Sequence, residues 1–166
     1  PLGGWANVVT LLRLSGVFVL IFNYDIYSDV TIGFLAITII SLDGLDGYLA
    51  RKYKTESEFG AFLDMETDAF FVASMSYMVY MIHPNFLIFL FPGLLRYLYL
   101  VIIHVLGLYG KKESFHPFSK WFAVAYFVAV ITSFLLPLSL SFYLTLVAGL
   151  GIVFSFSYSF VKLIRS

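Results

Sequence analysis

Residues 43–68 read DGLDGYLARKYKTESEFGAFLDMETD, and they join two long apolar blocks of the chain. Asp43 and Asp46 lie near the end of the first block, and Asp64 and Asp68 lie near the start of the second. Even on the most lenient scale, a charged side chain inside a bilayer costs about 2.5–3.5 kcal/mol. If the apolar blocks cross a membrane, these carboxylates indicate a functional site rather than ordinary packing.

The composition of the whole chain supports membrane insertion. Of 166 residues, 61% are hydrophobic and 12% are charged, whereas an average soluble domain has about 45–50% apolar and 25% charged residues. A membrane-spanning helix needs about 20 mostly apolar residues, and six blocks approach or exceed this length: 8–22, 29–50, 60–82, 86–108, 118–136 and 141–163. We therefore expect an all-α integral membrane protein with six transmembrane helices, and a single domain over residues 1–166.

Charge and cysteine content exclude several function classes. The formal net charge is zero, which argues against nucleic acid as a partner because such surfaces carry a basic excess. The chain has no cysteine, so it has no thiolate metal site and no cysteine nucleophile.

The distribution of cations predicts the orientation in the membrane. Lys and Arg outside the blocks lie only in alternate loops or after the last block, and cytoplasmic loops carry such an excess. These cations are Arg51, Lys52, Lys54, Lys111, Lys112 and Arg165, and Lys120, at the start of the fifth block, and Lys162, at the end of the sixth, lie on the same side. We expect a multi-pass protein with both termini and the carboxylate site on the cytoplasmic side.

The spacing of the carboxylates places them on helix faces that can meet. Asp43 and Asp46 are three residues apart, and Gly60, Asp64 and Asp68 follow at steps of four, so each set shares one face of its helix. Asp43 and Asp68 each lie about 12 Å inside the predicted helix ends. In an antiparallel helix pair the four carboxylates then come level in two pairs.

Four converging carboxylates need protons, cationic partners or a metal. Arg13, Arg51 and Arg96 are the candidate partners, and all-oxygen ligation selects a hard cation such as Mg²⁺, Mn²⁺ or Ca²⁺. Spacing alone leaves three interpretations open: a salt-bridge cluster that pins helices, a cation or proton transporter, and a site for metal and phosphate. A position near one face disfavours transport, because transporter sites lie near the midplane.

The pattern D-x-x-D-G-x-x-A-R, eight residues, then G-x-x-x-D-x-x-x-D, with all fixed positions present between residues 43 and 68, resembles the signature of the CDP-alcohol phosphotransferases. The resemblance implies transfer of a phosphatidyl or related group from a CDP-linked lipid, such as CDP-diacylglycerol, to the hydroxyl of a small alcohol, with release of CMP, in phospholipid biosynthesis. It also implies a homodimer. The alternative from another class is a cation transporter or a metal-binding membrane scaffold.

Residue roles follow from the same resemblance. Two ions, Mg²⁺ or Mn²⁺, are expected at Asp43, Asp46, Asp64 and Asp68, with Asp68 also the catalytic base. Donor binding is expected from Asp46, Gly47, Ala50, Arg51, Ser57 and Gly60. In the first block, N-x-x-T-x-x-R at residues 7–13 resembles the family's opening motif with Ala6 in place of its proline. Asn7 and Thr10 are therefore expected on the nucleotide side.

The acceptor stays open at the level of sequence. Residues 59–68, FGAFLDMETD, resemble the corresponding stretch of phosphatidylinositol synthases, but Ala69 stands where those enzymes usually have arginine. Phosphatidylglycerophosphate synthases place basic residues in the fourth and fifth spans, where this chain has Arg96 and Lys120. These two residues are the candidates for acceptor binding.

Overall fold

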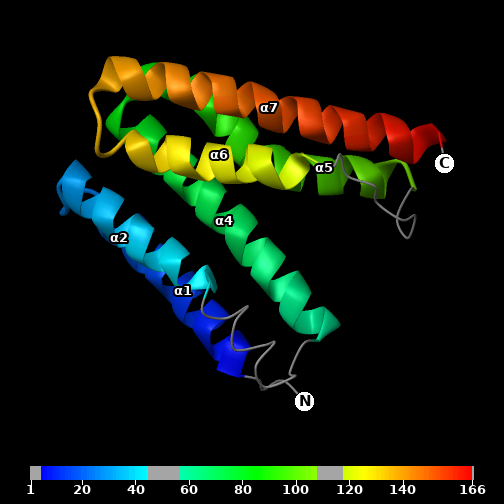
Figure 1. The fold of residues 1–166 in the computed structure, drawn as a ribbon, viewed down its shortest axis with the longest axis horizontal. Coiled ribbons are helices and arrows are strands. Elements are labelled where there is room, and N and C mark those ends of the chain that lie inside the picture. Colours follow the sequence, from blue (N-terminus) through cyan, green and yellow to red (C-terminus); the bar gives the residue numbers. More distant parts are fainter. Residues whose placement is uncertain (1–4, 45–56, 108–117, 166) are drawn as a thin grey trace. The chain divides into compact units, whose positions relative to one another are not determined.

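The computed structural model describes residues 5–44, 57–107 and 118–165 (Figure 1). All regular structure in these ranges is helical: α1 (Trp5–Asn23), α2 (Asp29–Ser41), α4 (Glu58–Ile82), the 3-10 helix η1 (Pro84–Phe89), α5 (Leu90–Val105), α6 (Ser119–Thr132) and α7 (Leu138–Arg165). The predicted site residues Asp46, Gly47, Ala50 and Arg51 lie outside the described residues. The chain divides into two compact units, Pro1–Ser74 and Met75–Ser166, which are described separately.

In the first unit, α1 and α2 lie side by side (Figure 1). Ser28 caps the start of α2, where its hydroxyl oxygen accepts a hydrogen bond from the Thr31 N–H at 3.3 Å. Such a cap satisfies one of the amide groups that the first turn leaves unpaired. The buried residues of α2 recur at helical spacing along one face and are Ile32, Gly33, Ala36 and Ile39.

Helix α4 begins at a second serine cap. The Ser57 hydroxyl oxygen accepts a hydrogen bond from the Gly60 N–H at 3.0 Å, and the Ser57 carbonyl accepts one from Ala61 N–H at 3.0 Å. This is the arrangement of an N-cap serine with the third residue of its helix. It fixes the start of α4 at Glu58, between one and two turns before Asp64.

In the second unit, α7 packs against α6, α5 and η1. Polar side chains are buried between these helices: the Tyr126 hydroxyl donates to the Phe89 carbonyl at 2.7 Å, and the Ser155 hydroxyl donates to Ser119 at 2.6 Å. Buried hydroxyls need partners of this kind. Around Tyr99 and Ile103 of α5 the contacts with Leu163 of α7 are apolar.

Two of the predicted spans are shorter in the structure than expected. The block at 118–136 forms an α-helix only from Ser119 to Thr132, and residues 133–136 continue as turns whose N–H groups donate to carbonyls three or four residues back. Pro137 follows directly and disfavours helical backbone at the residue before it. The block at 29–50 is interrupted, since α2 ends at Ser41 and Leu42 is its C-cap, although Asp43 and Gly44 are again helical.

The block at 86–108 also differs from a single continuous helix. It starts as η1, and α5 ends at Val105, where Gly107 takes a positive φ of 65° and the Gly107 N–H donates to the His104 carbonyl at 3.1 Å. A glycine in this conformation is a common helix terminator. Within the described residues, two helices are long and apolar enough to cross a membrane, Leu87–Val105 and Leu138–Ile164.

Candidate active site

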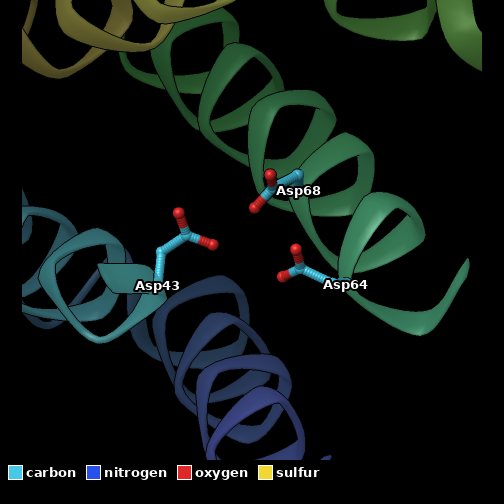
Figure 2. A group of neighbouring side chains, drawn as sticks. All are labelled: Asp43, Asp64 and Asp68. Atoms are coloured by element: carbon cyan, nitrogen blue, oxygen red, sulfur yellow. The ribbon is translucent and has the colours of Figure 1, made fainter. Parts of the chain in front are cut away.

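Four side chains of the first unit converge from three helical segments. Arg13 comes from the middle of α1, Asp43 follows the end of α2, and Asp64 and Asp68 lie one turn apart on α4. Figure 2 shows the three carboxylates, here called the carboxylate triad, pointing toward one another across the space between these segments. One ligand oxygen from each lies within 4.8 Å of those of the others.

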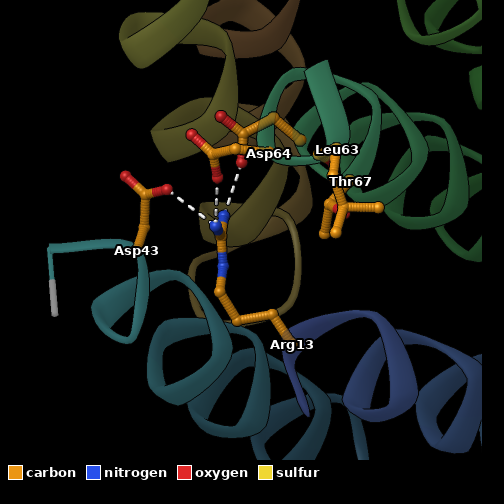
Figure 3. Close-up of polar contacts among 6 residues, drawn as sticks. Arg13, Asp43, Leu63, Asp64 and Thr67 are labelled. Atoms are coloured by element: carbon orange, nitrogen blue, oxygen red, sulfur yellow. Dashed lines mark hydrogen bonds and ion pairs between the residues drawn. The ribbon is translucent and has the colours of Figure 1, made fainter. Parts of the chain in front are cut away.

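The guanidinium of Arg13 occupies the centre of the carboxylate triad (Figure 3). Its Nη1 lies 2.8 Å from Asp43 Oδ1 and 2.7 Å from Asp64 Oδ1, and its Nη2 lies 2.5 Å from Asp68 Oδ1. The contacts to Asp64 and Asp68 are hydrogen bonds donated by the guanidinium. Arginine suits this position because its planar group carries five donors and stays charged.

Burial differs sharply between the cation and its partners. The side chain of Arg13 is 2% exposed, whereas those of Asp43, Asp64 and Asp68 are 43%, 41% and 35% exposed. The guanidinium therefore contacts the carboxylate triad from the protein interior, and each carboxylate remains partly exposed to solvent. A ligand can approach them there without crossing the α1 packing surface.

The charge of the cluster fits a further cation. Three carboxylates and one guanidinium leave a formal charge of −2 when all four are ionised, which equals the charge that one divalent ion neutralises. Carboxylate oxygens are the ligands that Mg²⁺, Mn²⁺ and Ca²⁺ prefer. The donor set of the carboxylate triad thus fits a hard divalent metal, while its central place already holds one cation, Arg13.

Two neighbouring polar residues of α4 lie outside this cluster. The buried Thr67 donates its hydroxyl to the Leu63 carbonyl at 2.8 Å, four residues back on its own helix (Figure 3). Glu66 is not one of the carboxylates that form the triad. Two residues correspond to about 200° around an α-helix, so Glu66 leaves α4 in a different direction from Asp64 and Asp68.

Asn7 and Thr10 belong to the same face of α1 as Arg13, as their spacing predicts. As whole residues, Asn7 and Thr10 are 9% and 3% exposed, and Arg13 is 1% exposed. Gly60 lies against this face: a Cβ added there would lie 2.9 Å from Asn7 Oδ1 and 3.1 Å from Ser57 Oγ. The structure therefore brings Asn7, Ser57 and Gly60 together near the start of α4.

The two predicted acceptor residues lie in the second unit. Arg96 is partly buried on α5. Lys120 is exposed in the first turn of α6, and its Nζ lies 5.6 Å from the centre of the Trp121 ring. A lysine over an indole face makes a cation–π contact, so Lys120 has a partner at the surface of its own helix.

Sequence reasoning placed Arg13 among three possible counter-charges but did not make it a site residue. The signal was present, since Arg13 is a charged residue inside an apolar block and shares a face with Asn7 and Thr10. Its spacing from the aspartates says nothing of distance in space. Only the packing of α1 reveals that Arg13 contacts Asp43, Asp64 and Asp68.

These features define an α-helical protein whose α1, α2 and α4 segments bring three carboxylates together around a buried arginine. A sequence model of the CDP-alcohol phosphatidyltransferase family matches residues 4–157, and the chain therefore belongs to this family of membrane enzymes. A relative from Arabidopsis thaliana, CDP-diacylglycerol--glycerol-3-phosphate 3-phosphatidyltransferase 2, is 42% identical over 73 residues. The similar region covers 41% of this chain and 30% of the plant protein.

Proposed function

We propose that the protein transfers the phosphatidyl group of a CDP-linked lipid such as CDP-diacylglycerol to the hydroxyl of a small alcohol and releases CMP. The observation that carries the proposal is the convergence of Asp43, Asp64 and Asp68, all at fixed positions of the family signature, into one cluster able to hold a metal. A cation transporter would share the carboxylates but would release no CMP.

The reaction needs a binding site for divalent ions, residues that bind the donor, and a base. Asp43, Asp64 and Asp68, with Asp46, would hold Mg²⁺ or Mn²⁺, two ions by family resemblance, and bound ions would offset charge on the diphosphate and the leaving CMP. Asn7, Thr10, Gly47, Ala50, Arg51, Ser57 and Gly60 are the proposed donor-binding residues.

Asp68 is the proposed catalytic base. The acceptor hydroxyl oxygen forms a bond to the phosphorus of the phosphatidyl group, and the bond between that phosphorus and the bridging oxygen of CMP breaks. The electron pair of the broken bond leaves with CMP, and the hydroxyl proton passes to an Asp68 carboxylate oxygen. Asp68 is the least exposed member of the carboxylate triad, with 35% of its side chain exposed. The main protein contribution to such transfers is to hold the reactants in line.

For the acceptor we propose sn-glycerol 3-phosphate. The plant relative that is 42% identical over 73 residues carries this acceptor in its name, and Arg96 is a cation deep within a predicted span. A guanidinium can grip a phosphate through two hydrogen bonds. Lys120 is the second proposed acceptor residue, although its contact with Trp121 gives it a surface role as well.

The proposed setting is a multi-pass membrane homodimer whose termini and carboxylate triad face the cytoplasm. Support for the orientation comes from the cations between the apolar blocks, and support for the dimer comes from family resemblance. A lipid donor gives a physical reason for a charged site within apolar helices, because the donor's acyl chains stay in the bilayer while its diphosphate reaches the carboxylates.

The test is CMP release by the purified full chain from CDP-diacylglycerol and Mg²⁺, with glycerol 3-phosphate, inositol, inositol phosphate, serine and choline offered separately. We expect CMP with one acceptor only, glycerol 3-phosphate. Arg96→Gln should then raise the KM for glycerol 3-phosphate about tenfold or more, and leave the KM for the donor within about twofold, because the lost contact is to the acceptor phosphate. No CMP with any acceptor would contradict the proposed activity, and an equal rise in both KM values would contradict the role of Arg96.

A further inference from the structure

We infer that Arg13 is the internal counter-cation of the carboxylate triad and competes with a divalent ion for it, so that Arg13 lowers the metal affinity of the site while stabilising the metal-free protein. This inference rests on the proposed function, in which the carboxylate triad holds a metal.

The first argument is position. The guanidinium lies 2.5 to 2.8 Å from one oxygen of every member of the carboxylate triad, and the ligand oxygens for a metal come from the same three residues. Figures 2 and 3 together show that Arg13 lies in the space on which the carboxylates converge. A divalent ion bound there would face a positive charge at close range, and like charges at such distances repel strongly.

The second argument is burial. With 2% of its side chain exposed, Arg13 has almost no water to solvate its charge, and a buried charge needs a partner. The carboxylate triad supplies that partner, and Arg13 in turn separates three carboxylates that would otherwise repel one another. Each side therefore stabilises the other when no metal is bound.

The third argument is the direction of approach. The carboxylates are 35 to 43% exposed while Arg13 is buried, so an ion arrives from the open side and the guanidinium holds the opposite side. Each carboxylate that turns toward the ion weakens its bond to Arg13. Metal binding consequently has to offset lost guanidinium contacts, which lowers the affinity.

The opposite possibility is that Arg13 holds the carboxylates in place for the ion and so raises the affinity. The two cases predict opposite effects of removing the guanidinium, and they can be separated without measuring catalysis. The experiment uses the full chain, purified in detergent, with Mn²⁺ binding followed by the loss of the free-ion electron paramagnetic resonance signal.

We expect Arg13→Gln to bind Mn²⁺ at least about tenfold more tightly than the wild type, because the competing charge is gone. Its thermal unfolding midpoint should fall in EDTA and recover with Mg²⁺, whereas the wild type should change little between the two conditions. Lys162→Gln is the matched control, since it removes the same charge from an exposed position on α7 and should behave like the wild type in both measurements.

Unchanged or weaker Mn²⁺ binding by Arg13→Gln would overturn the inference. Folding of this variant only with Mg²⁺ present would support it, because the ion then replaces the guanidinium. If the variant folds in neither condition, Arg13→Met decides: it also removes the competing charge but leaves no buried polar group in its place, so tighter binding supports the inference and unchanged or weaker binding overturns it. CMP release by the wild type in the same preparations separates this result from the proposed function, which fails if the wild type releases no CMP, whatever its Mn²⁺ affinity.

Discussion

Asp64 and Glu66 lie two residues apart on α4, yet only Asp64 belongs to the carboxylate triad. This pair offers a matched test of the site, because both substitutions remove one carboxylate from the same turn of helix. Asp64→Asn should lower CMP release at least about 100-fold, since a lost metal ligand removes several kcal/mol of transition-state stabilisation. Glu66→Gln should stay within a few-fold of the wild type. Full activity in Asp64→Asn, measured at saturating Mg²⁺, would contradict a metal-holding role for the triad.

Gly60 and Gly44 form a second matched pair of single residues. A Cβ at Gly60 would lie 2.9 Å from Asn7 Oδ1, whereas a Cβ at Gly44 would have nothing within 4 Å. Gly60→Ala should displace the buried Asn7 amide and lower the free energy of unfolding by about 1 kcal/mol or more, with a raised KM for the CDP-linked donor. Gly44→Ala should be neutral or slightly stabilising, because alanine is the better helix former. Thermal unfolding and donor titrations check both variants, and equal behaviour of the pair would contradict the close approach of α1 to α4.

At the scale of single residues, the sequence predicts the convergence of the carboxylates better than the identity of their cationic partner. Spacing at steps of three and four placed Asp43, Asp64 and Asp68 on faces that can meet, and the structure confirms their convergence. Spacing along one helix says nothing about which residue of another helix lies opposite. The sequence therefore could not choose among Arg13, Arg51 and Arg96, and the packing of α1 shows that Arg13 contacts the carboxylates, while Arg51 lies outside the described residues.

Among the helices, the close contact between α6 and α7 depends on small residues. A Cβ at Gly151 of α7 would lie 2.7 Å from Cδ1 of Phe122 on α6. Gly151→Ala should therefore lower the unfolding midpoint, with a cost of about 1–3 kcal/mol for overpacking. Phe122→Ala removes the ring atoms that clash, so Gly151→Ala should cost less in that background and the two changes should be non-additive. Strict additivity in thermal unfolding would show that the two residues do not meet.

Element boundaries were predicted less well than element existence. Each predicted apolar block contains a helix in the described residues, but α2 and α6 end early, at Ser41 and Thr132. The apolar residues continue past both helix ends, and hydropathy alone does not indicate where the helical backbone ends within an apolar segment. Pro137 was the visible signal for α6, whereas no proline or helix-ending glycine marks the C-cap at Leu42.

For the whole molecule, the family match places the chain in a family of membrane enzymes, while the number and direction of its spans stay predictions. Two helices, Leu87–Val105 and Leu138–Ile164, meet the length and hydropathy expected of a span within the described residues. Several cations that determine the predicted orientation, such as Arg51 and Lys111, lie outside those residues. Orientation therefore depends on an electrostatic bias in the sequence and needs its own experiment.

The chain contains no cysteine, so a single introduced cysteine reports one position without background. Ser114 belongs to the segment between the fourth and fifth predicted spans, together with Lys111 and Lys112, and Asn85 belongs to the segment between the third and fourth, which carries no Lys or Arg. If positive loops stay in the cytoplasm, a membrane-impermeant maleimide added to intact cells should label Asn85→Cys and should label Ser114→Cys only after the membrane is opened. CMP release by each variant verifies that the labelled protein is folded. The reverse pattern would invert the orientation and place the carboxylate triad on the outer side. Labelling of both positions in intact cells would show that Asn85 and Ser114 lie on the same side of the membrane, which contradicts a single span between them.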